Sequence, residues 1–139
     1  MREIRYIDAI REAQVEEMRR DDSVFIFGEG IGPRGGNFTQ TKGMWPEFGE
    51  KRLIDVPLSE LGFTGIAIGA AMTGLRPIVD IMFWDFAYEA MGQIINQAGR
   101  IHYMSNGQFS VPMVIRGAMG VGQSAGGHHS CRSYPLFAQ

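Results

Sequence analysis

Four short, continuously apolar runs alternate with helix-like segments, and this alternation constrains the fold more than any other feature of the sequence. The runs are VFIFGEG from Val24, RLIDVP from Arg52, PIVDIMFWDF from Pro77 and QFSVPMVIRG from Gln108. Runs that are apolar at successive positions are typical of strands covered on both faces, as in parallel sheets. The sequence therefore predicts an α/β fold: a three-layer, doubly wound, mainly parallel sheet with helices on both faces.

Three segments outside these runs have helical character. Residues 5–20 carry apolar side chains at near-helical spacing, and Ser59 can cap a second helix that ends near Gly74. This second helix is apolar nearly all round, so we expect it to be buried on most sides. A third helix is predicted over residues 86–105. Residues 1–139 form a single domain in this interpretation. Because a doubly wound fold would normally continue with another strand, the domain is expected to be incomplete at its C-terminus.

Charge and composition narrow the classes of partner and compartment. The net charge is −2, and no basic run exceeds Arg19-Arg20, which argues against nucleic-acid binding. A single cysteine, Cys131, excludes an intramolecular disulfide framework and fits a reducing compartment. The N-terminus is charged from its second residue, and no window approaches eighteen uninterrupted apolar residues. We therefore expect a cytoplasmic protein without membrane contact.

The loop after the first run contains a weak nucleotide-binding signal. Gly30, Gly32 and Gly35 spell G-x-G-x-x-G, and Asp55 follows where a ribose-binding acid would stand. A dinucleotide site needs a helix that begins directly on the glycine loop, whereas residues 37–52 lack helical periodicity. A dinucleotide-binding oxidoreductase is therefore disfavoured, and the simpler alternative is a glycine-rich surface loop. Glu29 at the strand end is then either solvated or directed at a ligand or partner chain.

Polar residues collect where the predicted strands end. Ligands of open parallel sheets bind beyond the carboxyl ends of the strands. The residues at or just after these ends include Glu29, Ser59, Glu60, Asp85, His128 and His129. The sequence thus predicts a ligand site at this edge of the sheet.

The residues of this edge leave several roles open. Glu60 can simply interact with the N-terminus of its helix, or it can be a half-buried carboxyl that exchanges a proton with a ligand nitrogen. His129 can be a solvated imidazole or a metal ligand with His128 and Cys131, although no fourth ligand has credible spacing. From the sequence pattern alone, Phe83 and Phe86 are interpreted as core aromatics.

Taken together, the motifs resemble a known family. The segments GEGIGPRGGNF, RLIDVPLSELGFTGIAIGAAMTGLRPIVDIMFWDF, QIINQAGRIHYMSNGQFSVPMVIRGAMGVG and GGHHS are similar to the beta subunit of thiamine-diphosphate-dependent 2-oxo acid dehydrogenases. This group includes the pyruvate, branched-chain 2-oxo acid and acetoin enzymes. The resemblance covers residues 4–137 and implies the pyrimidine-binding domain of a transketolase-like fold. In the family, the cofactor lies between this domain and a diphosphate-binding domain on an alpha subunit.

The resemblance also implies roles for individual residues. Glu60 matches the glutamate whose carboxyl group hydrogen-bonds the cofactor's pyrimidine nitrogen N1′, which favours the tautomer that removes the thiazolium C2 proton. His129 matches a histidine that faces the thiazolium side. Phe86, Met82 and Leu58 match positions around the aminopyrimidine, and Phe83 also matches a pocket position. Glu29 lies in the family next to the entrance of the cofactor site, and we expect water or a partner residue to link it to Glu60.

The family further implies an assembly and a reaction. The resemblance implies thiamine-diphosphate-dependent oxidative decarboxylation of a 2-oxo acid, followed by acyl transfer to a lipoyl-bearing acyltransferase component. The implied partner is an alpha subunit in a heterotetramer, which would hold magnesium because this chain lacks the family's G-D-G…N motif and has no metal site of its own.

Two departures from the family qualify these expectations. Cys131-Arg132-Ser133 replaces the usual continuation of the histidine loop, and we expect the chain to lack the family's C-terminal domain. We therefore expect the isolated chain to be inactive. The alternative function is a non-catalytic module, derived from the family, that self-associates.

Overall fold

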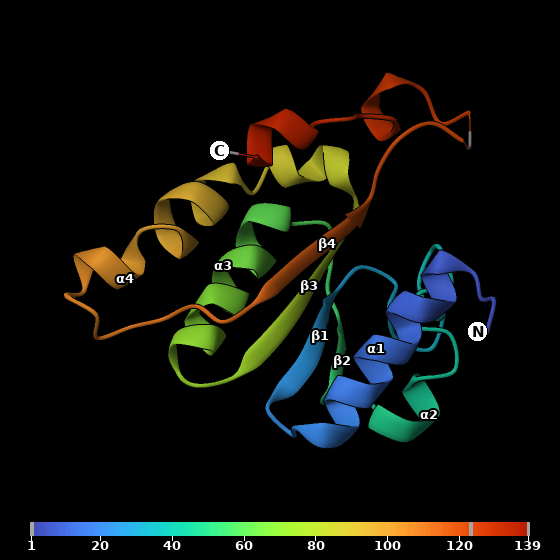
Figure 1. Cartoon of the computed structure of the whole chain (residues 1–139), viewed down its shortest axis with the longest axis horizontal. Helices are drawn as coiled ribbons and strands as arrows, with labels where there is room; N and C mark the ends of the chain where they lie inside the picture. Colours follow the sequence, from blue (N-terminus) through green and yellow to red (C-terminus); the bar gives the residue numbers. More distant parts are fainter. Residues whose placement is uncertain (1, 123, 139) are drawn as a thin grey trace.

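The computed structural model describes residues 2–122 and 124–138, and its centre is a four-stranded parallel sheet (Figure 1). The strands lie in the order β2-β1-β3-β4, and every neighbouring pair is parallel. Their bounds are β1 (Val24–Gly28), β2 (Leu53–Asp55), β3 (Arg76–Phe83) and β4 (Val114–Ala118). The α-helices are α1 (Tyr6–Arg20), α2 (Trp45–Phe48), α3 (Glu60–Met72) and α4 (Ile101–Met104). This arrangement confirms the predicted α/β class.

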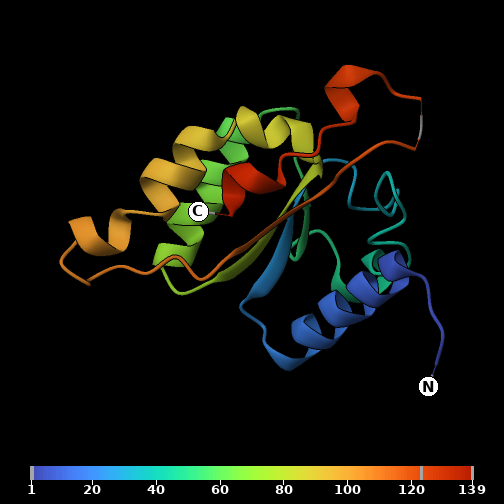
Figure 2. The ribbon, with the colours of Figure 1, turned by 45° about the horizontal axis from the view of Figure 1, so that its top comes forward.

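Helices cover both faces of the sheet, which gives three layers (Figure 2). Side chains of a strand point alternately to the two faces, so β1 feeds two separate cores. Val24 and Ile26 face α1, while Phe27 packs on the α3 side with Phe63. The strand is therefore apolar at successive positions because each face has its own cover.

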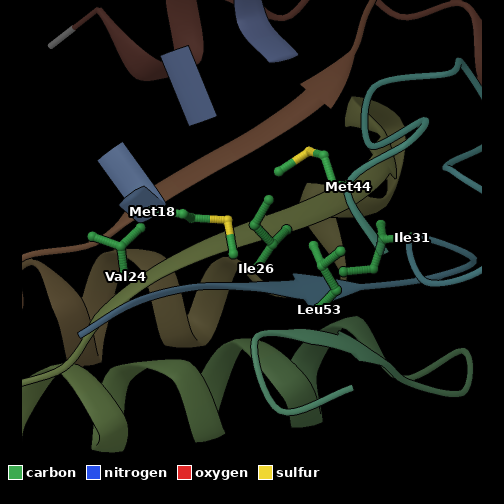
Figure 3. Close-up of a cluster of buried hydrophobic side chains, with 6 residues drawn as sticks. All are labelled: Met18, Val24, Ile26, Ile31, Met44 and Leu53. Atoms are coloured by element: carbon green, nitrogen blue, oxygen red, sulfur yellow. The ribbon is translucent and has the colours of Figure 1, made fainter. Parts of the chain in front are cut away.

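The core on the α1 side joins the helix to the glycine-rich loop (Figure 3). Its fully or almost fully buried members are Met18, Val24, Ile26, Ile31, Met44 and Leu53. Ile31 and Met44 come from the loop between β1 and β2, so the glycine-rich segment is part of the folded core. It is not the free surface loop that the simpler sequence interpretation describes.

Two of the predicted helices differ from the structure in their details. Ser59 precedes α3 at the cap position, but its hydroxyl donates to the carbonyl oxygen of Pro57 at 3.1 Å and does not cap the helix. The single helix expected over 86–105 is wrong, because the segment divides into a 3₁₀ helix (Trp84–Tyr88), a π-helix (Gly92–Ala98) and α4. Glycine favours such breaks: a Cβ on Gly99 would lie 2.8 Å from the carbonyl oxygen of Ile95.

The ends of two strands also differ from the prediction. β3 stops at Phe83, so Phe86 lies on the following 3₁₀ helix and not at the strand's end. β4 begins only at Val114, after Pro112, which cannot donate to a sheet ladder. The segment 37–52 contains the one-turn helix α2, which is too short to show periodicity.

α3 buries one face against the sheet and leaves the other open. Phe63, Ala67 and Ala71 are buried, whereas Leu61 and Ile66 are 51% and 62% exposed. The expected burial on most sides is therefore not met within the part of the chain that the structure describes. Across residues 2–122 and 124–138, none of the helices has the length and apolar character needed to cross a membrane.

Candidate functional site

The carboxyl ends of β1 and β3 and the start of α3 bring most of the predicted site residues to one edge of the sheet. Glu29 follows β1 directly, and Glu60 is the first residue of α3. Phe86 lies on the 3₁₀ helix that continues β3, and His129 ends the 3₁₀ turn Gly127–His129. Because all strands are parallel, these residues come from segments far apart in sequence yet converge at one edge.

Glu29 is a buried carboxyl group. Glu29 is only 6% exposed, and its Oε1 has no hydrogen-bond partner among the described residues. Burial, followed by the negative charges of Glu60 and Asp80, raises the pKa of Glu29 from 4.5 to about 7. The carboxyl group can therefore gain or lose a proton near neutral pH.

Glu60 lies at the mouth of an open hollow. Ser59, Glu60, Leu61, Gly62, Phe86 and Glu89 line this hollow, whose volume is about 540 Å³. Glu60 is half-buried and lies in the first turn of α3, at the positive end of the helix dipole. An ionisable carboxyl group and an aromatic ring thus share one concave surface, which suits a flat heteroaromatic ligand with a ring nitrogen.

The rings of Phe83 and Phe86 flank the imidazole of His129. The imidazole meets Phe83 edge-on at a centroid distance of 4.6 Å and Phe86 at 5.3 Å. His129 Nδ1 is buried and has no hydrogen-bond partner among the described residues. Phe83 and His129 also line a second hollow of about 290 Å³. The structure therefore connects Glu60 to His129 through Phe86.

Met82 occupies an irregular position at the end of β3. Asp80 pairs with Arg116 and Phe83 with Ala118, so β3 contains one residue more than β4 between these pairs. Met82 lies in this bulge with φ +65°, a conformation that non-glycine residues seldom adopt. Its Sδ accepts from Asn37 Nδ2 at 2.7 Å. The bulge attaches the end of β3 to the glycine-rich loop.

Leu58 and Asp55 behave differently from the other candidates. The side chain of Leu58 is 76% exposed. Asp55, at the position of a ribose-binding acid, accepts from the backbone N–H of Gly32 at 3.1 Å through Oδ1. Asp55 therefore attaches the glycine loop to the end of β2, although it is the acid that a dinucleotide's ribose would need. In the described residues, the first helix after this loop is α2.

Sequence reasoning missed two groups near the site. Glu89 lines the same hollow as Glu60, and its spacing of three residues from Phe86 on a helical segment could have indicated this. Asp80 is 1% exposed, pairs with Arg116, and accepts from Gln40 Nε2 at 2.8 Å and from the backbone N–H of Met82 at 2.9 Å. Asp80 stands alone in an apolar run, so the sequence gives no indication that it lies near the site.

A metal cluster is not part of this edge as the structure describes it. Over residues 2–122 and 124–138, no three His, Cys, Asp or Glu side chains come together as a potential metal site. The hydrogen bonds of the histidine loop involve backbone groups, the Ser130 hydroxyl and the carboxylate of Asp85.

Comparisons with known proteins agree on one family. Residues 2–139 match the family described as transketolase, pyrimidine binding domain. The pyruvate dehydrogenase E1 component subunit beta of Chaetosphaeridium globosum is 51% identical over 137 residues, which is 99% of this chain and 42% of that protein. The chloroplastic subunit beta-4 of Oryza sativa subsp. japonica is 48% identical over 97% of this chain and 34% of its own length. The corresponding subunit of Rickettsia bellii is 46% identical over 91% of this chain and 41% of its own. The chain therefore spans well under half the length of the curated relatives it matches.

Proposed function

Because the chain belongs to the transketolase pyrimidine-binding domain family, we propose that it holds the aminopyrimidine end of thiamine diphosphate in a 2-oxo acid dehydrogenase. The proposed reaction is oxidative decarboxylation of a 2-oxo acid with transfer of the acyl group to a lipoyl carrier. The relatives named pyruvate dehydrogenase E1 component subunit beta support this class of reaction. The observation that carries the proposal is the hollow shared by Glu60 and Phe86.

The residues of this edge fit the cofactor chemically. Glu60 would hydrogen-bond the pyrimidine ring nitrogen, and Phe86 would pack against the ring. Glu29 Oε1 and His129 Nδ1 are buried without protein partners among the described residues, which leaves polar atoms available to a bound group. When bound, thiamine diphosphate supplies the electron sink for decarboxylation, and the protein supplies orientation and proton handling.

Glu29 and Glu60 would have different roles in proton transfer. Glu60, at the positive end of α3, would exchange a proton with the ring nitrogen. Glu29, whose pKa of about 7 lets it carry a proton near neutral pH, would lie protonated beside Glu60. His129, held against Phe83 and Phe86, would act on the side of the site where substrate or the lipoyl acceptor approaches. Met82 and Leu58 complete the proposed cofactor surroundings.

The proposed partners are an alpha subunit in a heterotetramer and a lipoyl-bearing acyltransferase component. The alpha subunit would hold the magnesium and the diphosphate. Large apolar side chains exposed on the α3 side of the sheet suit burial against a partner subunit or a second copy; they include Leu61, Ile66, Ile95, Tyr103 and Met104.

Calorimetric titration of thiamine diphosphate with magnesium tests the cofactor proposal. We expect binding when the chain is combined with its alpha subunit. Glu60→Gln should lower the rate of 2-oxo acid decarboxylation in the assembled enzyme by about 10²- to 10⁴-fold, as expected for loss of a general acid or base. Glu16→Gln, an exposed change on α1, is the matched control and should leave the rate unchanged. Absence of cofactor binding in the assembly, or normal turnover in Glu60→Gln, contradicts the proposal.

The second candidate is a non-catalytic module that self-associates. The exposed Leu61 and Ile66 on α3 favour it. Sedimentation of the chain alone distinguishes the two: self-association with no cofactor binding, even with the alpha subunit present, supports the module.

A further inference from the structure

Asp85 attaches the histidine loop, residues 126–131, to the end of β3. Its Oδ1 accepts from the backbone N–H of Cys131 at 3.0 Å. The carbonyl oxygen of Cys131 in turn accepts from the backbone N–H of Gly120 at 2.9 Å, just beyond β4. The backbone of Cys131 therefore bridges the continuations of two neighbouring strands. Its thiol lies 3.8 Å from the Ser133 hydroxyl and takes no part in this bridge.

The other hydrogen bonds of the loop close it on itself. The N–H of His129 and the hydroxyl of Ser130 both donate to the carbonyl oxygen of Gly126, at 3.3 and 2.9 Å. Gly126 has φ +74°, which lets the chain turn there. These bonds shape the turn but do not hold it against the sheet. Among the described residues, the turn is held in place by the backbone of Cys131 and by the aromatic contacts of His129.

The hydrogen bond from Cys131 N–H to Asp85 Oδ1, here called the tether, and the aromatic contacts of His129 both involve one short stretch of chain. Asp85 lies between Phe83 and Phe86, whose rings meet the His129 imidazole at 4.6 and 5.3 Å. One 3₁₀ helix carries both Asp85 and Phe86, so the carboxylate holds the loop next to the rings that contact the imidazole. We propose that Asp85 is a positioning residue, which holds the His129 imidazole between Phe83 and Phe86 for the reaction; this rests on the proposed function of His129.

The expected strength of the tether follows from its chemistry. A backbone N–H donating to a carboxylate is a charge-assisted hydrogen bond, about twice as strong as a neutral one. Loss of such a bond should shift the ratio of attached to detached loop on the order of 10- to 100-fold. Asparagine keeps an acceptor oxygen at Oδ1 and should retain most of the attachment, whereas alanine removes the acceptor.

Imidazole resonances of the chain report this attachment without any cofactor. Rings at these distances shift the His129 signals strongly, so Asp85→Ala should move them toward the values of an unstructured histidine. Asp85→Asn should leave them close to those of the unchanged protein. His102 is the internal control, because it lies on α4, at the other end of the molecule from the histidine loop (Figure 1). Its Nδ1 lies 2.8 Å from the carbonyl oxygen of Phe109.

The outcomes separate the tether from the proposed reaction. Unchanged His129 signals in Asp85→Ala overturn the proposal, and so do equal changes at His129 and His102, which mean a disturbed fold. In the assembled enzyme, Asp85→Ala should lower kcat by at least about tenfold while cofactor affinity stays unchanged. Asp85→Asn should keep kcat close to that of the unchanged enzyme. If the His129 signals move and kcat does not, the tether stands and the role of His129 in the reaction is overturned.

Discussion

The protonation of Glu29 links the stability of this chain to pH. The ordinary pKa of the carboxyl group is 4.5, and in the folded chain burial and the charges of Glu60 and Asp80 raise it to about 7. Below pH 4.5 the group is protonated in both the folded and the unfolded states. Between 4.5 and 7 only the folded chain retains the proton, so stability falls as pH rises through this window. Above about 7 the whole penalty is present.

The size of the effect follows from the same values. The separation between 4.5 and about 7 corresponds to about 3 kcal/mol of free energy of unfolding. Glu60 is half-buried, so solvent screens part of the repulsion, and we expect about 1 to 2 kcal/mol. Glu29→Gln removes the charge while it keeps the shape. The variant should therefore be more stable than the unchanged chain by this amount above neutral pH, and equal to it near pH 4.5.

Urea denaturation followed by circular dichroism, repeated across this pH range, measures the difference. Glu16→Gln on α1 serves as the control and should give a difference that does not change with pH. Glu60→Gln should lower the pKa of Glu29, and carbon NMR of the Glu29 carboxyl group reads this directly. A stability gain in Glu29→Gln that is the same at every pH would refute the reasoning, as would a carboxyl group that titrates near 4.5.

Two further predictions concern the packing that supports the site. Gly28→Ala should destabilise the chain by about 1 to 3 kcal/mol, because the new Cβ would lie 2.5 Å from the Asp80 carbonyl oxygen; Gly69→Ala on α3, with nothing within 4 Å, should be neutral or slightly stabilising in the same urea assay. Arg116→Met should lower the free energy of unfolding by about 3 to 5 kcal/mol because it leaves Asp80 buried without its cation, and a loss equal to that of the exposed change Arg100→Met would contradict this account.

Much of the fold follows from local sequence patterns. Continuous apolar runs predict parallel strands, and the order of strands and helices predicts the layers, because each strand needs apolar cover on two faces. Four elements confirm this: α1, β1, β2 and α3 lie within two residues of their predicted bounds. The helix predicted over 86–105 fails because periodicity does not reveal how glycines at 92 and 99 divide a helical segment.

The candidate site follows from sequence only in part. Glu60, Phe86 and His129 could be named from their positions after predicted strands and from the family resemblance, and the structure brings them to one edge. Leu58 is also named by its motif, yet its side chain is 76% exposed. Sequence identifies which residues follow a strand, but the direction of each side chain depends on the backbone geometry after it.

The sequence by itself determined the α/β class, the family and the edge of the sheet where the polar residues gather, because these depend on residue types and their order. The tertiary structure alone decided the chemistry at that edge. The burial of Glu29, the bulge at Met82 that Asp80 holds, and the tether from Asp85 to Cys131 join residues far apart in the chain. Proton affinity and side-chain position arise from such neighbours, since burial and charge act through space and not along the sequence.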